Sequence, residues 1–186
     1  MKTKYRIMNS MEELLICYSY DEITIKMITE QVPIARQGFY HFYENKEDLC
    51  RKMYLYFTNS GELISGPFTL RDFIRRDLSK MNRHMNFFKK LANQHYGEDL
   101  FDILFQNVFK LYLRMLNYRL QNKISQDLEN MLKLYCYGGL YYLINYLKSG
   151  QPINVEEQTT LYIDTMPQRI RDLLTVGSYP AEILKG

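Results

Sequence analysis

Residues 34–46, IARQGFYHFYENK, place side chains that can hydrogen-bond to nucleic acid among a crowd of aromatic rings. Arg36 and Gln37 each offer paired hydrogen-bonding atoms that match the edge of a base. The hydroxyl of Tyr40 and the ring nitrogens of His41 can bond to phosphate oxygens or base edges. On a helix these side chains form two neighbouring rows, 36 with 40 and 37 with 41. The segment therefore carries the chemistry of base and phosphate recognition.

The elements around this segment decide which of its faces is buried. A helix through it turns Phe39, Phe42 and Tyr43 to one side, where they can lock onto neighbouring helices. Thr24 is a natural N-cap for a short preceding helix, which Pro33 ends in a tight turn. This order predicts a helix–turn–helix, whose second helix enters the major groove of DNA. Two ordinary short helices with a solvated polar face would give the same periodicity, so the pattern alone leaves both interpretations open.

The composition is that of a folded chain. Its 186 residues are 46% apolar, which argues against disorder and suffices for one sizeable domain or a small domain joined to a larger one. The longest apolar run, 135–147, is too short to span a bilayer, and the charged N-terminus has no signal-peptide pattern. Three scattered cysteines suggest neither a disulfide framework nor a CxxC metal site and fit a reducing cytoplasm. We expect a cytoplasmic protein without membrane association.

The net charge of +3 does not by itself indicate a nucleic-acid partner. Residues 1–60 hold eight basic and eight acidic side chains, so the charge of the candidate helix–turn–helix region is balanced. A DNA-binding function must therefore depend on where charges lie on the fold.

Helical periodicity extends along the chain, and no alternating strand pattern interrupts it. Glycines and a proline in 58–69 mark a junction. We predict an all-α protein of about nine helices. A DNA-binding domain built on a three-helix helix–turn–helix unit spans 1–58, and a helical bundle for dimerisation and effector binding spans 59–186. Caps and breakers place the helices at about 4–17, 25–32, 35–43, from 46, 70–82, 85–95, 98–121, 126–149 and 155–175, the last split at Pro167.

The stretch 23–49, ITIKMITEQVPIARQGFYHFYENKEDL, resembles the DNA-binding domain of the TetR family of transcriptional regulators. That family pairs a T-(V/I)-x-x-I helix with an R-x-x-F-Y recognition helix and a K-x-x-L helix start. The resemblance covers about the first 55 residues. It implies that Tyr40 and Lys46 hold phosphates while Arg36, Gln37 and His41 face bases. The full DNA-contacting set that it implies is Thr24, Arg36, Gln37, Gly38, Tyr40, His41 and Lys46.

Two departures from the family pattern affect the turn and the recognition helix. Pro33 stands where the family commonly has glycine, and a proline ring is expected to exclude a positive φ there. Ala35 replaces the usual serine or threonine, so the recognition helix loses a hydroxyl cap.

The stretch 135–157 resembles one TetR branch, the regulators of dihydroxyacetone-kinase operons, through a glycine pair, an apolar helix and a Glu-Glu junction. The resemblance implies that the helices on either side of Gly150 pair with the same two helices of a partner chain. The apolar stripe offered for this interface is Leu140, Leu143, Ile144 and Leu147. The alternative is that the stripe belongs to the core within one chain.

The effector pocket has the weakest sequence signal. Aromatic and methionine side chains recur at helical spacing in 101–118, and the candidates are Phe105, Phe109, Tyr112 and Met115. Such a stripe is also typical of an ordinary core. His84, His95 and Cys136 could be considered as metal ligands, but their spacing has no ligand pattern. We expect neither a metal nor a cofactor.

Three classes of function can be compared. No phosphate loop, HExxH, GxSxG or paired-carboxylate motif occurs, so we do not expect an enzyme. The favoured hypothesis is a transcriptional regulator that binds a pseudo-palindromic double-stranded operator as a homodimer, under control of a small-molecule or protein effector. The alternative is a protein-binding module that retains the helix–turn–helix fold but no longer binds DNA.

Overall fold

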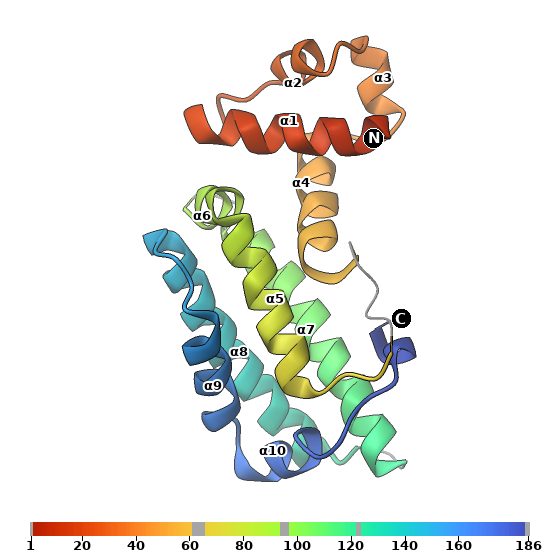
Figure 1. The fold of residues 1–186 in the computed structure, drawn as a ribbon, viewed down its shortest axis with the longest axis vertical. Coiled ribbons are helices and arrows are strands. Elements are labelled where there is room, and N and C mark those ends of the chain that lie inside the picture. The colour runs from red at the N-terminus through yellow and green to blue at the C-terminus, as the bar shows by residue number, and fades with distance from the viewer. Residues whose placement is uncertain (1, 61–65, 94–96, 122–123, 185–186) are drawn as a thin grey trace.

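The computed structural model describes residues 2–60, 66–93, 97–121 and 124–184, and within these ranges the fold is all-α, as predicted (Figure 1). An isolated antiparallel bridge joins Phe68 and Tyr179. A π-helical turn, Tyr56–Ser60, extends α4, and a 3₁₀ turn lies at Ala181–Leu184. The α-helices are α1 Thr3–Cys17, α2 Ile25–Gln31, α3 Arg36–Tyr40, α4 Lys46–Leu55, α5 Leu70–Arg83, α6 Met85–Ala92, α7 Gly97–Leu120, α8 Gln126–Ser149, α9 Val155–Asp164 and α10 Gln168–Leu174.

Side-chain caps fix the helix ends close to the predicted positions. Thr24 accepts a hydrogen bond from the amide of Met27, and Thr69 forms a reciprocal capping box with Asp72 at the start of α5. Gly150 closes α8 with a φ of 69°, a left-handed conformation that favours glycine. The chain breaks between α9 and α10 at Pro167, so the predicted split is confirmed.

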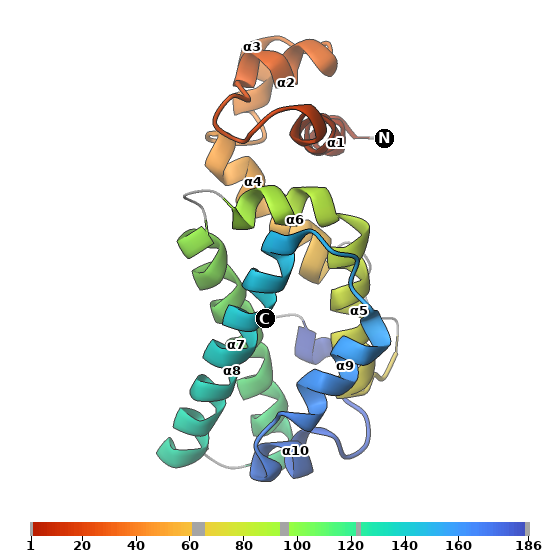
Figure 2. The same cartoon turned by 90° about the vertical axis from the view of Figure 1, so that its left-hand side faces the viewer.

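Helices α1, α2 and α3 lie together at one end of the molecule, and α4 leads from them into the larger part (Figure 1). We call α1–α3 with the first turns of α4 the head, and α5–α10 the body. Ile7, Met11, Ile28 and Phe39 are fully buried in the head. The long helices α7 and α8 run side by side through the body, and α10 packs on α7 (Figure 2).

Head and body are joined by packing as well as by the chain. The rings of Tyr54 on α4 and Phe57 in the turn after it meet Phe88 and Phe87 of α6 edge-on, with centroids 6.0 and 5.1 Å apart respectively. The C-cap of α5, His84, stacks on Phe57 with centroids 3.7 Å apart. Head and body therefore share one continuous core, and the domain boundary near residue 58 stays a prediction.

Candidate nucleic-acid interface and candidate ligand pocket

Helix α3 divides its side chains as the sequence predicts. Phe39 is completely buried and Tyr43 nearly so, whereas Arg36, Gln37, Tyr40 and His41 are all exposed on the outer side of the head. The helix is only five residues long and ends at Tyr40, so His41 lies just beyond it rather than in its middle. These four exposed side chains form what we call the recognition face.

Contacts beneath the recognition face hold α3 in place. Burial brings the Tyr43 hydroxyl to the backbone oxygen of Lys4, 2.9 Å away on α1, which satisfies the polar tip of a buried ring. Burial raises the pKa of Tyr43 above its ordinary range, and nearby Asp48 adds to this effect. The phenol therefore stays neutral and donates its proton to the carbonyl, which ties α3 to α1.

Contacts within the chain place little constraint on two residues of α3, Arg36 and Gly38. The Arg36 guanidinium donates a 3.3 Å hydrogen bond to the Tyr40 hydroxyl, an exposed contact that is cheap to exchange for one with a ligand. A methyl group added at Gly38 would meet only the Ile34 side chain, at an ordinary 3.6 Å. Intrachain packing therefore does not require glycine at position 38, although glycine lowers helix stability.

Lys46 is tied into the head by its own chain. Its ammonium donates to the backbone oxygens of Tyr20 and Ile23, at 2.6 and 2.8 Å, and lies 4.0 Å from the centroid of the Tyr20 ring. Two of its three protons therefore brace the loop between α1 and α2. A phosphate contact by Lys46, as the family resemblance implies, would have to use its remaining donor.

The turn between α2 and α3 corrects one expectation. Pro33 has a φ of 24°, although a proline ring was expected to exclude positive values. The reason is the closure of α2, where the Ile34 amide donates to the oxygen of Thr29 at 3.2 Å. This bond reaches back over the last turn of the helix and requires a left-handed residue at position 33. The second departure has the expected result, because Ala35 makes no side-chain cap for α3.

The residues proposed for the dimer interface lie inside the chain. Leu140, Leu143, Ile144 and Leu147 on α8 are 0–7% exposed, because this side of α8 packs against the body. They offer little surface to a partner in this conformation, which agrees with the alternative that the stripe belongs to the core of one chain. The exposed apolar row is on another side of the same helix, at Leu134, Tyr137 and Tyr141, and Leu161 on α9 is exposed as well. We call these four residues with Gly138 the α8–α9 face.

The two neighbouring glycines of α8 have different surroundings: Gly139 lies toward the interior and Gly138 lies on the α8–α9 face. A methyl group at Gly139 would lie 3.2 Å from the Tyr162 ring, whereas one at Gly138 would meet nothing within 4 Å. Gly139 is therefore explained by packing within the chain. Gly138 lies on an exposed surface, where glycine makes the helix less stable than alanine would by about 1 kcal/mol. No contact among the described residues requires glycine at this position.

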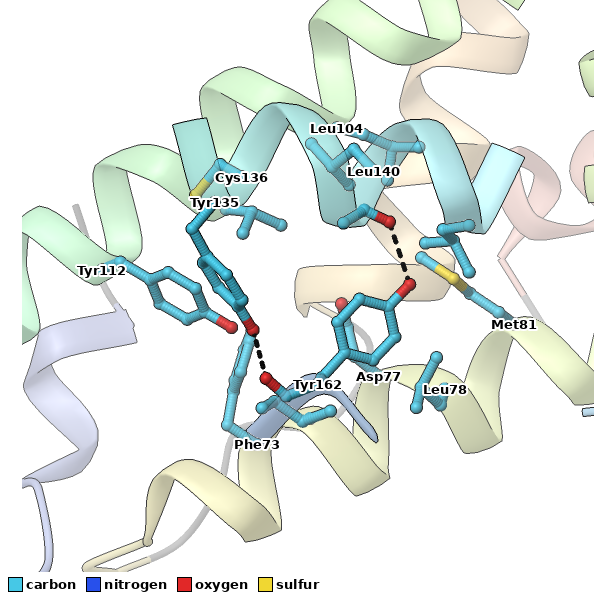
Figure 3. Close-up of a pocket in the computed structure, with 14 residues that line it drawn as sticks. Phe73, Asp77, Leu78, Met81, Leu104, Tyr112, Tyr135, Cys136, Leu140 and Tyr162 are labelled. Atoms are coloured by element: carbon cyan, nitrogen blue, oxygen red, sulfur yellow. Dashed lines mark hydrogen bonds between the residues drawn. The ribbon is translucent and has the colours of Figure 1, made fainter. Parts of the chain in front are cut away.

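A pocket of about 60 Å³ lies in the body between α5, α7, α8 and α9 (Figure 3). Its lining is apolar and aromatic with one carboxylate, Asp77. The lining residues are Phe73, Ile74, Asp77, Leu78, Met81, Leu104, Val108, Tyr112, Tyr135, Cys136, Gly139, Leu140, Leu143 and Tyr162. Asp77 borders this pocket and is partly buried. Burial raises the pKa of Asp77 to about 7, against the opposing effect of the nearby Lys80 and Arg76 charges.

Only one of the four effector candidates lines this pocket, and that is Tyr112. Phe105 and Phe109 instead stack with each other, and Phe105 also stacks on Tyr137 with ring centroids 4.3 Å apart. Met115 is fully buried without lining the pocket. Sequence analysis missed Asp77, although its position held a signal. The apolar side of α5 repeats at 73, 74, 78 and 81, and an acid at 77 interrupts that stripe.

The side chains considered for metal binding have other surroundings. The Nδ1 atom of His84 lies 2.6 Å from a carboxylate oxygen of Glu12, and Cys136 borders the pocket. His95 lies outside the described residues. Across the parts of the chain that the structure describes, no three histidine, cysteine or acidic side chains gather as metal ligands do. Within the same ranges, no helix combines the length and apolar character needed to cross a bilayer.

Comparison with known proteins supports the fold but not a family assignment. No family model matches the sequence, and no curated protein matches it. Among solved structures, the chain superimposes on one described as the dihydroxyacetone kinase operon activator DhaS, with a TM-score of 0.67. The match covers 91% of this chain and 97% of that protein, at 13% sequence identity. It shows that the chain has a TetR-like all-α fold.

Proposed function

We propose that the chain is a transcriptional regulator that binds a pseudo-palindromic DNA operator as a homodimer and responds to an effector. The observation that carries this proposal is the recognition face, four exposed base- and phosphate-bonding side chains at the second helix of a helix–turn–helix. The likeness to an operon activator supports the same class of function.

The recognition face suggests a division of work on DNA. Arg36 and Gln37 can make paired hydrogen bonds to guanine and adenine edges in the major groove, respectively. The Tyr40 hydroxyl can reach the phosphate backbone and thereby fix the register of α3. Gly38 leaves room on α3 for close approach of its backbone to DNA. A helix of five residues covers few base pairs, so a unique site needs two heads.

The α8–α9 face is the surface that we propose for pairing the two chains. Leu134, Tyr137 and Tyr141 follow one another at spacings of three and four along α8, which makes one continuous apolar row. Gly138 lies within this row and would allow a partner helix to approach closely. An exposed apolar row that contains an otherwise unexplained glycine is suited to contact another helix closely. We propose the same face of a second chain as its partner, because dimers most often pair identical surfaces.

A route for effector control runs along α5. Its middle lines the pocket through Asp77 and Met81, and its C-cap His84 bonds to Glu12 on α1 of the head. Helix α6 follows directly and packs against α1 as well. A ligand that shifts α5 would therefore move the attachment point of the head. That shift would change the population of dimers whose two recognition faces match the operator spacing.

The protein-binding alternative has specific support in the head. The recognition helix lacks a side-chain cap at Ala35, and the Lys46 ammonium is largely engaged within the chain. Such a head could present the recognition face to a protein partner. The two functions differ in their dependence on salt and base sequence, because DNA binding releases counterions and protein binding need not.

Conservative substitution of Arg36 tests the base-reading role. On an operator selected from a random DNA library, Arg36→Lys should keep most of the nonspecific affinity, because the charge remains. It should lower the ratio of specific to nonspecific affinity by about tenfold or more, because lysine cannot make the paired contact. Fluorescence anisotropy against specific and scrambled duplexes measures this ratio.

The matched controls separate this role from general weakening. Tyr40→Phe should weaken binding to both duplexes by a similar factor, since it removes a phosphate contact. Arg169→Ala, an exposed substitution on α10, should change neither affinity. An unchanged ratio in Arg36→Lys would remove Arg36 from the set of base-reading residues.

A further inference from the structure

The carboxylate of Asp77 is the unusual feature of the pocket. It is partly buried, and the charges that act on it are those of Lys80 and Arg76. It lines the pocket together with the rings of Phe73, Tyr112 and Tyr162, which belong to three different helices (Figure 3). Partial burial beside aromatic side chains disfavours the ionised carboxylate, because it loses part of its contact with water. The pocket therefore presents one ionisable acid among apolar and aromatic side chains.

Two of the tyrosine hydroxyls that border the pocket are already hydrogen-bonded to the backbone. Tyr135 donates to the backbone oxygen of Tyr162 at 2.6 Å, and Tyr162 donates to the backbone oxygen of Gly139 at 3.1 Å. Both hydroxyls are committed to the backbone, as the dashed lines in Figure 3 show. Their rings remain available to a ligand, because an aromatic face attracts a cation electrostatically.

We propose that this pocket binds a small organic cation, whose ammonium group pairs with Asp77 while its short alkyl part lies against the surrounding rings. The volume of about 60 Å³ exceeds the room that one water needs and is well below the roughly 150 Å³ of a cavity that holds benzene. A primary amine of about three carbons is the matching size. The regulatory consequence of this binding depends on the function proposed above, but the binding itself does not.

The charges around Asp77 are consistent with a cationic ligand and give it a pH dependence. Arg76 and Lys80 on α5 are the nearby cations, and neither lines the pocket. The titratable groups that face Asp77 from the other helices are all neutral near pH 7, namely Tyr54, Tyr112, Tyr135, Cys136 and Tyr162. Ionisation of Asp77 supplies the negative charge, so affinity for the cation should rise as the pH increases from 6 to 8.

Titration with n-propylammonium chloride tests the proposal. At pH 8 we expect saturable binding by calorimetry, with a Kd on the order of 1 mM for a ligand of this size. At about ten times that concentration the Tm should rise by about 4 °C. Neither 1-propanol nor sodium propionate, which have the same size without the positive charge, should stabilise the protein. Sodium chloride at matched ionic strength controls for screening.

Substitutions at Asp77 locate the binding. Asp77→Asn should abolish calorimetric binding of n-propylammonium, whereas Asp164→Asn, an exposed acid on α9, should leave it intact. Asp77→Glu retains the charge and should keep measurable binding, and circular dichroism verifies that each variant is folded. Stabilisation by 1-propanol equal to that by the amine, or binding that survives in Asp77→Asn, would overturn the proposal.

A DNA-binding readout separates this inference from the function on which its regulatory role rests. If n-propylammonium binds through Asp77 and alters operator affinity in the wild type alone, both proposals are supported. Binding through Asp77 with no effect on operator affinity would leave the cation site in place and remove its regulatory role. Operator binding that is normal while no cation binds would reject the site and leave the regulator proposal standing.

Discussion

A chain that carries Leu134→Glu and Tyr141→Glu is expected to be a monomer that no longer binds its operator. These side chains are 75% and 69% exposed in the single chain, so glutamate at either position leaves the intrachain core intact. In a dimer the same positions would bury four like charges without partners, which costs several kcal/mol. We expect the wild type to sediment as a dimer at micromolar concentration. The variant should sediment as a monomer and lose at least about 100-fold in operator affinity.

Two controls distinguish pairing from damage to the fold. Val176→Glu alters another exposed apolar side chain, 63% exposed and outside the α8–α9 face, and should leave the dimer and its DNA binding unchanged. Gly138→Ala should stabilise α8 in the monomer by about 1 kcal/mol yet weaken the dimer, because it adds a methyl group where two helices meet. A double glutamate variant that still sediments as a dimer would reject the α8–α9 face.

Replacing Asp77 by asparagine is expected to stabilise the unliganded protein strongly at pH 8, less at pH 5 and least below pH 4. The pKa of Asp77 in the folded chain is about 7, above its ordinary value of 3.8. A group whose pKa is raised on folding favours the folded state while it is protonated. That contribution is complete below about pH 4 and is lost as the pH rises through 7. At pH 8 the buried carboxylate therefore costs about 2–4 kcal/mol, which the neutral amide avoids.

Denaturation of both proteins across pH measures this effect. The difference in unfolding free energy between Asp77→Asn and the wild type should grow from pH 5 to pH 8, and at pH 8 it corresponds to a rise in Tm of roughly 4–16 °C. Other acids, such as Asp48 and Asp72, are present in both chains and cancel in the difference. A difference that is constant with pH would mean that folding does not raise the pKa of Asp77.

Local signals predicted the fold because caps and breakers act within a few residues. Thr24, Thr69, Gly150 and Pro167 each set a helix end through their own backbone or an adjacent amide, and all four do so at the predicted place. The recognition face followed from the same short-range geometry, since rows at spacing four and a buried Phe39 determine which side of α3 is exposed.

Tertiary packing decided the features that sequence analysis missed. Helix α8 is apolar on more than one side, and periodicity could not tell which side the body would cover. Periodicity therefore pointed to Leu140, which the body covers, and not to Leu134, which is exposed. The hydrogen bonds that Lys46 donates likewise depend on tertiary structure, because their acceptors lie in a loop more than 20 residues away in sequence. The pocket combines four helices, and only the interrupted stripe around Asp77 offered a local indication of it.

Selection from a random double-stranded DNA library with the wild-type protein tests most directly whether the chain is a dimeric, sequence-specific DNA-binding protein. The expected result is an enriched inverted repeat, with half-site centres one or more helical turns apart, bound by two chains. Its affinity should exceed that for scrambled DNA by about 10³-fold or more and fall steeply with salt. Enrichment of no motif, with equal weak binding to every duplex, would contradict this function and favour a head that binds protein.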